Sequence, residues 1–248
     1  MRTNGQKPSP LMDKALRPAQ TIRRELFQIY DLLWQCFGDR KWWPAETREE
    51  VIIGAILCQN VSWANTEKAI ARLRQAGLLS FARLYEASPE RIEPCIVSTR
   101  YYRMKAKRLK AFAHFLMEAY DGDLDRLFAL EMEQLRGELL AIHGIGPETA
   151  DDILLYAAEK PSFVVDAYTK RIFHRLGYAA EKIPYEELRR WLMQHLPEDV
   201  SLFNQYHALL DGVGHHYCAP RKPNCAGCPL RTVCQYARYP YASRIPSR

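Results

Sequence analysis

Four cysteines near the end of the sequence have a spacing that could enclose a metal centre. Cys218, Cys225, Cys228 and Cys234 form the pattern C-x6-C-x2-C-x5-C. Thiolates bind both zinc and iron, but structural zinc sites usually show two C-x2-C pairs, and here only Cys225 and Cys228 are paired in that way. The spacing therefore favours an iron–sulfur cluster over a zinc ion.

Disulfide bonds are the alternative use of these cysteines. The first residues, MRTNGQKPSPLMDKALRPAQ, contain no apolar core of a signal peptide. We therefore expect a cytoplasmic protein, in which thiols stay reduced. The other cysteines, Cys36, Cys58 and Cys95, lie in apolar sequence and are expected to be buried thiols rather than ligands.

A glycine hairpin is predicted at residues 144–146. Gly144 and Gly146 flank Ile145 in a turn that needs unusual backbone angles, and Pro147 suits the first position of the helix that follows. The free N–H groups of such a hairpin can face an anion, and a nucleic-acid phosphate is the natural candidate. A tight connection between two helices, with no ligand, is the alternative.

Asp166 stands where a helix is expected to begin, after the apolar residues Val164 and Val165. A carboxylate at such a position can stabilise a developing cation and accept a proton from an attacking water. It is equally a good helix cap, and the local sequence alone favours that simpler interpretation.

Helices must position all of these residues, because the apolar periodicity is helical nearly throughout. The three- and four-residue spacing predicts one helix that ends at Gly38 and another around Trp191, and Ser88-Pro89 reads as a cap and a first helical residue. The apolar run at residues 51–57 fits a buried helix as well as a strand. We expect an all-α fold without a transmembrane span.

The charge balance agrees with a nucleic-acid partner. The chain has 35 Lys and Arg against 29 Asp and Glu, which gives a net charge of +6. Six basic residues crowd residues 100–110 beside Tyr101 and Tyr102 and predict a phosphate-contacting surface. A solvated helix face is the alternative.

Taken together, these motifs resemble the helix-hairpin-helix DNA glycosylase superfamily. The resemblance rests on G-I-G-P-E-T-A at 144–150, on V-V-D at 164–166 and on a cysteine spacing like that of endonuclease III, and it covers about residues 42–234. The segments L-C-Q-N-V-S-W at 57–63 and Y-Y-R-M-K-A-K-R-L at 101–109 are most similar to 3-methyladenine DNA glycosylase III. That family lacks the cluster which the four cysteines imply.

The resemblance implies a two-domain fold. A six-helix domain at 44–160 would carry the hairpin, and a discontinuous domain at 20–43 and 161–236 would surround a [4Fe-4S] cluster held by Cys218, Cys225, Cys228 and Cys234. The active cleft would lie between the domains, and residues 1–19 and 237–248 are expected to be loose tails. The implied partner is double-stranded DNA with a damaged base, bound by a monomer that is associated with the nucleoid if it is bacterial.

The resemblance also implies a reaction, the hydrolysis of the N-glycosidic bond of a flipped-out base, with Asp166 as the catalytic carboxylate. Endonuclease III-like lyases place at position 148 the Lys that forms a Schiff base, and Glu148 cannot do so. We therefore expect a monofunctional glycosylase. Glu148 could line the base pocket or merely favour the helix N-terminus.

Further residues match the superfamily's DNA and base contacts. Gln59 and Tyr101 correspond to its space-filling and wedge residues, and the hairpin and Lys105 are expected to contact DNA. Trp43 and Trp63 match the positions that sandwich the base, and aromatic faces suit a cationic alkylated purine such as 3-methyladenine. Two alternatives stay open: an endonuclease III-like glycosylase and AP lyase acting on oxidised pyrimidines, and a non-catalytic DNA-binding protein.

Overall fold

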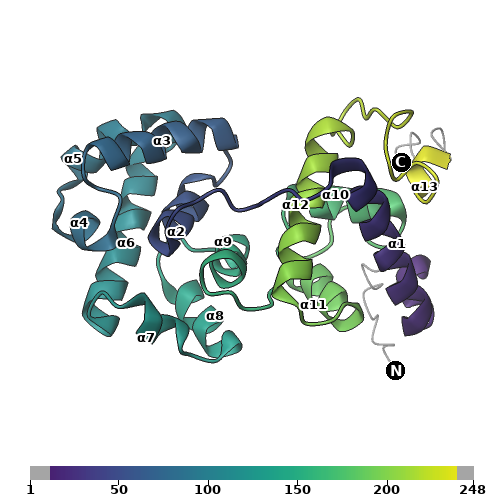
Figure 1. Ribbon diagram of the computed structural model, residues 1–248, viewed down its shortest axis with the longest axis horizontal. Coiled ribbons are helices and arrows are strands. Elements are labelled where there is room, and N and C mark those ends of the chain that lie inside the picture. Colours follow the sequence, from purple (N-terminus) through teal and green to yellow (C-terminus); the bar gives the residue numbers. More distant parts are fainter. Residues whose placement is uncertain (1–11, 239–248) are drawn as a thin grey trace, which may run out of the picture. The chain divides into compact units, whose positions relative to one another are not determined.

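A computed structural model describes residues 12–238 of the 248-residue chain. It consists of helices joined by loops, and no strand occurs between Met12 and Arg238, which confirms the all-α class (Figure 1). The chain forms two compact units: unit 1 comprises Met1–Trp42 and Phe163–Arg248, and unit 2 comprises Trp43–Ser162.

Unit 2 contains eight α-helices and three helical turns of other types, all within the described part of the chain. They are α2 (Arg48–Leu57), α3 (Trp63–Gln75), α4 (Phe81–Glu86), α5 (Pro89–Ile92), η2 (Glu93–Cys95), η3 (Val97–Thr99), α6 (Tyr102–Tyr120), α7 (Leu124–Phe128), α8 (Met132–Ala141), α9 (Pro147–Asp152) and the π-helical turn η4 (Ile153–Ala157). The expectation of six helices is therefore wrong, because local caps such as Ser80 and Asp123 start additional short helices.

The apolar run at residues 51–57 forms the central helix α2 of unit 2. Thr47 caps this helix by accepting a hydrogen bond from the Glu50 N–H at 3.1 Å. Every residue from Val51 to Leu57 is buried, and α3, α6 and α9 all pack against α2. A helix that is apolar on all sides must be surrounded by other elements. This burial explains why its sequence pattern did not distinguish it from a strand.

A buried ion pair joins α8 to α9, the two helices on either side of the glycine hairpin. Arg136 donates hydrogen bonds from Nε and Nη2 to the two carboxylate oxygens of Asp151, at 2.9 and 3.0 Å. The Ser162 hydroxyl donates to the same carboxylate at 2.5 Å. The buried carboxylate is thus satisfied by several hydrogen bonds. Because Arg136 lies on α8 and Asp151 on α9, the ion pair holds together the helices that lead into and out of the hairpin.

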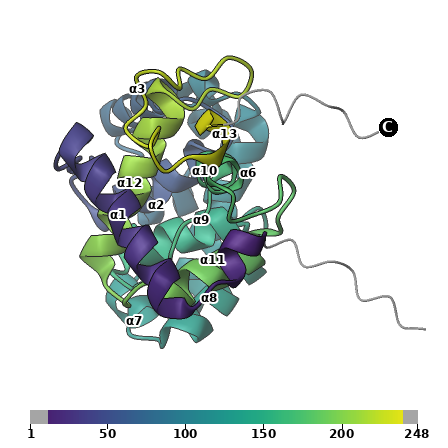
Figure 2. The same cartoon turned by 90° about the vertical axis from the view of Figure 1, so that its right-hand side faces the viewer.

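Unit 1 is built from η1 (Asp13–Leu16), α1 (Ala19–Phe37), α10 (Ala167–Leu176), α11 (Tyr185–His195), α12 (Val200–His216) and α13 (Gln235–Arg238). The helix α1 packs beside α12, as Figure 1 and Figure 2 both show, and α10 packs between α12 and α13. The predicted helices ending at Gly38 and around Trp191 are present. None of the described helices is both long and apolar enough to cross a membrane.

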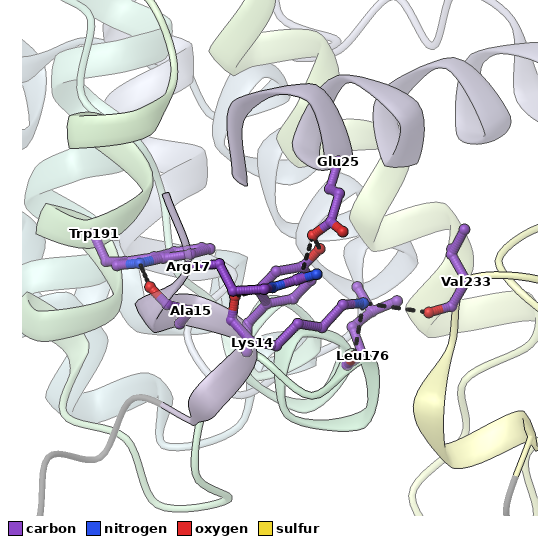
Figure 3. A network of polar contacts seen from close by, with 8 residues as sticks. Lys14, Ala15, Arg17, Glu25, Leu176, Trp191 and Val233 are labelled. Carbon is purple, nitrogen blue, oxygen red and sulfur yellow. Dashed lines mark hydrogen bonds and ion pairs between the residues drawn. The ribbon is translucent and has the colours of Figure 1, made fainter. Parts of the chain in front are cut away.

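The segment at residues 12–19 is part of unit 1, although it was expected to be a loose tail. Ala15 is buried, and its carbonyl accepts a hydrogen bond from the Trp191 indole at 3.2 Å. Figure 3 shows this network, which also contains Lys14, Arg17, Glu25, Leu176 and Val233. The expectation failed because these partners are distant in sequence. Residues 1–11 and 239–248, also expected to be tails, lie outside the described residues.

Candidate functional site

The glycine hairpin depends on its first glycine and not on its second. Gly144 has a φ of +87°, and a Cβ built there would lie 2.3 Å from Cγ of Arg108. Gly146 has an extended backbone that any residue adopts, and nothing lies within 4 Å of its built Cβ. Ile145 is only 5% exposed, so its side chain belongs to the core. Only the backbone of Ile145 is therefore available to a ligand.

Replacing Gly144 by Ala is expected to lower the free energy of unfolding by about 1–2 kcal/mol, because the left-handed conformation is costly for a residue with a Cβ. Gly146→Ala is the matched control, since its backbone and surroundings accommodate a methyl group. Denaturant unfolding of the two variants measures the difference. Equal stability losses in both would show that the φ angle of Gly144 is not the cause.

Gln59 is held against the hairpin from the end of α2. Its side-chain nitrogen donates to the Gly144 carbonyl at 3.3 Å and to the Thr149 hydroxyl at 2.7 Å. Arg108 donates to the Gln59 side-chain oxygen. Gln59 therefore lies beside the hairpin. Arg108, which the sequence predicts only as one residue of a basic run, contacts Gln59 and lies close to Gly144 of the hairpin.

A groove of about 550 Å³ runs beside the hairpin in unit 2. None of the residues that line this groove is acidic. They are Tyr101, Tyr102, Arg103, Met104, Lys107, Arg108, His143 and Gly144. Tyr101 is 66% exposed, and Arg100 and Tyr101 both have positive φ angles, which cost free energy in residues other than glycine. The strained turn presents an aromatic ring to solvent at the edge of a positively charged surface.

Lys105 does not belong to that surface, which corrects the sequence prediction. The side chain is only 2% exposed, and its ammonium group donates to the carbonyls of Leu57 and Thr99 at 2.7 and 2.6 Å. Burial lowers the pKa of Lys105 to about 8. Lys105 thus holds the end of α2 to η3 from inside unit 2 and does not contact a phosphate.

Trp43 and Trp63 contact each other directly. Their ring centroids lie 5.0 Å apart with an interplanar angle of 87°, and Trp43 also contacts the Tyr156 ring at 5.2 Å. A base sandwiched between two parallel rings needs a separation of about 7–8 Å, two van der Waals contacts. The two indoles therefore do not form a sandwich in this structure, contrary to the expectation.

Trp63 also lines a second groove, of about 360 Å³, between α2 and α3. The charged residues that line this second groove are Glu46, Glu50, Glu67 and Arg74, so acidic side chains outnumber basic ones there. Arg74 donates to both carboxylate oxygens of Glu50 at 2.9 Å. An aromatic ring beside exposed carboxylates is a surface that attracts cations.

Glu148 is an exposed residue in the first turn of α9, directly after the hairpin. Burial raises the pKa of the Cys58 thiol, and the negative charges of Asp152 and Glu148 raise it further. Glu148 therefore lies within electrostatic reach of the end of α2, where Gln59 is also found. The structure thus groups Glu148, Gln59 and the hairpin in one region of unit 2.

Asp166 caps the helix α10, as its sequence position predicts. Its Oδ1 accepts a hydrogen bond from the Thr169 N–H at 2.7 Å, and the side chain is half-buried. Within the described chain, its Oδ2 accepts no hydrogen bond. One oxygen is therefore fixed by the backbone while the other stays available.

Asp211, on α12, is not predicted as a site residue from the sequence; burial raises its pKa, and the charge of Asp166 contributes in the same direction. The sequence signal for a polar site here is the four-residue spacing of His207, Asp211 and His215, which places them on one face of α12.

All seven cysteines are free thiols, and Cys36 is exposed rather than buried as expected. Burial, with smaller contributions from the charges of Cys218, Cys234 and Cys225, raises the pKa of Cys228 to about 11, so these thiols lie near one another. Between Met12 and Arg238, no three acidic, His or Cys side chains converge closely enough to hold a single metal ion. Four neighbouring thiols are a donor set that suits either iron or zinc.

Two arginines tie the cysteine loop to the helix that Asp166 caps. Arg171 donates to the Cys218 carbonyl at 2.7 Å. Arg175 donates from Nη1 to the Cys218 sulfur at 3.1 Å and to the Ala219 carbonyl at 2.9 Å. The position of α10, and with it that of Asp166, is therefore coupled to the conformation of this loop.

Comparison with known proteins supports a single family. Residues 53–198 match the family described as "HhH-GPD superfamily base excision DNA repair protein". A Methanocaldococcus jannaschii protein whose name provisionally calls it a DNA repair glycosylase is 42% identical over 211 residues, which cover 84% of this chain and 95% of that one. Endonuclease III of Thermotoga maritima is 32% identical over 188 residues, covering 76% and 83% of the two chains.

Solved structures show the same fold. An endonuclease III–DNA complex superposes with a TM-score of 0.75 at 23% identity, over 90% of this chain and 98% of that one. The 3-methyladenine DNA glycosylase MagIII of H. pylori, bound to 1,N6-ethenoadenine, gives a TM-score of 0.64 at 22% identity, over 79% and 96% of the chains.

Proposed function

The chain belongs to the HhH-GPD superfamily of base excision DNA repair proteins and is a DNA glycosylase, and from this premise we propose that it is monofunctional and acts on an alkylated purine. It would act as a monomer on double-stranded DNA, releasing the base and leaving the strand uncut. The observation that carries this proposal is Glu148, a carboxylate in the first turn of the hairpin helix. Base release followed by strand scission only after alkali is the expected result.

Asp166 is the group we assign to the hydrolysis. Cleavage of an N-glycosidic bond develops positive charge on the sugar, which a nearby carboxylate stabilises electrostatically. The water that attacks the sugar must lose a proton, and the carboxylate accepts it. The Thr169 N–H holds Oδ1 at 2.7 Å, which leaves Oδ2 for the water or the sugar.

Because residue 148 is a glutamate, the Schiff-base route of a lyase is excluded at this position. A lyase needs an amine that attacks the sugar carbon and forms a Schiff base, and a carboxylate has no such nitrogen. The lysine with a strongly lowered pKa in unit 2, Lys105, is buried and bonded to two carbonyls, so it does not replace that amine. Both observations support hydrolysis by water.

The groove beside Trp63 supports a cationic base as the substrate. Its indole ring and the carboxylates of Glu46 and Glu67 attract positive charge. An alkylated purine such as 3-methyladenine carries a positive charge and is already a good leaving group. Such a base needs no general acid, and we assign none.

Replacing Trp63 by Ala is expected to lower kcat/KM for 3-methyladenine release about tenfold, because stacking on an aromatic ring contributes about 1–3 kcal/mol per base. Trp63→Phe keeps an aromatic face and should lose less. Trp34→Ala is the control, since Trp34 is a 42% exposed tryptophan of unit 1 without a proposed role. An unchanged kcat/KM in Trp63→Ala would contradict the role of this groove.

DNA binding is assigned to the hairpin and the groove beside it. The hairpin backbone would contact a phosphate, while the exposed side chains of Arg100, Arg103 and Lys107 would neutralise others. Gln59, beside the hairpin, is the residue we assign to fill the space of the flipped nucleotide, and Tyr101, presented by the strained turn, is the one we assign as the wedge. Flipping is required because the base cannot be reached inside a duplex.

The four cysteines of the loop would hold a [4Fe-4S] cluster. When bound, the cluster cross-links residues 218–234 and holds the loop in one conformation. Arg171 and Arg175 would carry that constraint to α10, and the exposed Arg221, Lys222 and Arg231 would face the DNA backbone. A structural role for the cluster follows from these contacts.

An endonuclease III-like glycosylase and AP lyase is the second candidate. It is favoured by the 32% identity to endonuclease III of Thermotoga maritima. It would require another amine in place of Glu148, and trapping of a covalent protein–DNA adduct with borohydride would support it.

A further inference from the structure

Three neighbours hold the side chain of Gln59 in one place. Gln59 is half-buried in the turn directly after α2. The nitrogen of its amide donates to the Gly144 carbonyl at 3.3 Å and to the Thr149 hydroxyl at 2.7 Å. The oxygen of the amide accepts a hydrogen bond from Nη1 of Arg108. Both ends of the amide are therefore bound within unit 2.

These neighbours also fix which way the Gln59 amide points. A backbone carbonyl only accepts hydrogen bonds, whereas a guanidinium only donates them. Turning the amide around would place its oxygen against the Gly144 carbonyl and its NH2 group against Arg108, so two attractive contacts would become repulsive. Without Arg108, nothing on the oxygen side would oppose that rotation. The guanidinium is thus the group that determines the amide orientation on its side.

Arg108 reaches Gln59 by crossing the glycine hairpin. A Cβ built on Gly144 would lie 2.3 Å from Cγ of Arg108 and 2.7 Å from its Cδ and Nε. The stem of Arg108 therefore lies directly on the glycine, in space that a side chain at position 144 would occupy. On the other side, Nη2 of Arg108 donates to the sulfur of Met104 at 3.3 Å. The hairpin and α6 together aim the guanidinium at Gln59.

The charge of Arg108 is not compensated by a carboxylate. In the part of the chain that the structure describes, its guanidinium bonds only to a neutral amide and a thioether, and its Nε is buried without a hydrogen bond. An arginine that is partly removed from water usually pairs with an acidic group, and an unpaired buried N–H costs free energy. An apolar side chain at this position would avoid that cost. The arrangement therefore indicates a role for Arg108 other than stability.

We propose that Arg108 is a positioning residue for base flipping, which holds the amide of Gln59 ready to fill the space of the flipped nucleotide. This inference rests on the proposed function of Gln59. A flexible side chain loses rotamer freedom when it is inserted into a duplex, and a side chain that is already fixed in the free protein loses less. Arg108 itself contacts neither the base nor the sugar in this scheme and acts through Gln59.

The test is a double-mutant cycle on single-turnover base release, measured with saturating protein on a duplex that contains an alkylated purine. Arg108→Met removes the guanidinium and keeps a flexible apolar stem beside Gly144. It should slow release about fivefold, because ordering one rotamer-rich side chain costs enough free energy to change a rate by that order. Gln59→Ala should also slow release. The double variant should be no slower than Gln59→Ala alone, since Arg108 then has no amide to hold.

Lys107→Met is the matched control for the loss of a positive charge. Lys107 is the exposed neighbour of Arg108 on α6 and lines the same groove, but it does not bond to the Gln59 side chain. As a proposed phosphate contact it should contribute to DNA affinity, and its replacement should change that affinity by the same factor with Gln59 as with Gln59→Ala. Denaturant unfolding of each variant verifies that it is folded under the conditions of the measurement.

The outcomes separate this inference from the proposed function. If Arg108→Met slows release by the same factor in the presence and in the absence of the Gln59 amide, Arg108 acts independently of Gln59 and the proposal is overturned. A wild-type rate in Arg108→Met would also overturn it. If Gln59→Ala matches wild type, the role assigned to Gln59 fails and this inference fails with it, while base release stands. If wild type releases no base from any duplex, the proposed function fails as well.

Discussion

Replacing Asp166 by Asn should slow base release about a thousandfold without unfolding the protein. The amide oxygen can still accept the hydrogen bond that the Thr169 N–H now donates to Oδ1, so the cap of α10 is kept. The lost negative charge no longer stabilises the sugar cation, and the amide cannot accept a proton from water. In comparable sites each of these two effects raises the reaction rate about 10²–10⁴-fold, and their contributions are not additive.

Asp199→Asn is a matched control for this change. Asp199 caps α12 by accepting a hydrogen bond from the Leu202 N–H at 2.8 Å, in the same unit and with the same geometry as Asp166. Its variant should retain the wild-type rate. Single-turnover release from an alkylated duplex measures both variants, and a rate for Asp166→Asn within tenfold of wild type would contradict the catalytic role.

Replacing Glu148 by Lys should convert the protein into one that forms a covalent adduct with DNA. The new amine would lie in the first turn of α9, directly after the hairpin. The positive end of a helix disfavours a second positive charge, which leaves more of the amine neutral and nucleophilic. Borohydride reduction should then trap a Schiff base, whereas wild type should give no adduct.

The control for this gain of function is a lysine placed elsewhere on the surface of unit 2. Glu131 is exposed at the start of α8, and Glu131→Lys adds the same charge change away from the hairpin. It should give no trapped adduct. Trapping by wild type would instead establish the lyase candidate, and its failure in Glu148→Lys would show that position 148 does not reach the sugar.

The local features of the site were predictable from the sequence, because they depend on neighbours in the chain. Gly144 adopts its positive φ, and Asp166 caps the helix that follows it, as turn and capping rules indicate. The cysteine spacing likewise places the thiols near one another within a single loop.

The errors arose where long-range packing decides the outcome. Lys105 lies in a basic run that reads as a surface, but the Leu57 carbonyl, distant in sequence, draws its ammonium group inside. Trp43 and Trp63 match a pair of base-binding positions, yet their rings meet edge to face. Residues 12–19 resemble a tail in composition, although Trp191 holds Ala15 in place. None of these contacts leaves a signal in a local pattern.

The central claim is that this glycosylase hydrolyses an alkylated purine and does not cut the strand. The most direct test is base release by wild-type protein from matched duplexes with an alkylated, an oxidised, a deaminated or a mismatched base, each analysed with and without alkali. We predict release of 3-methyladenine, with strand scission only after alkali. Scission without alkali, or release confined to oxidised pyrimidines, would contradict the claim.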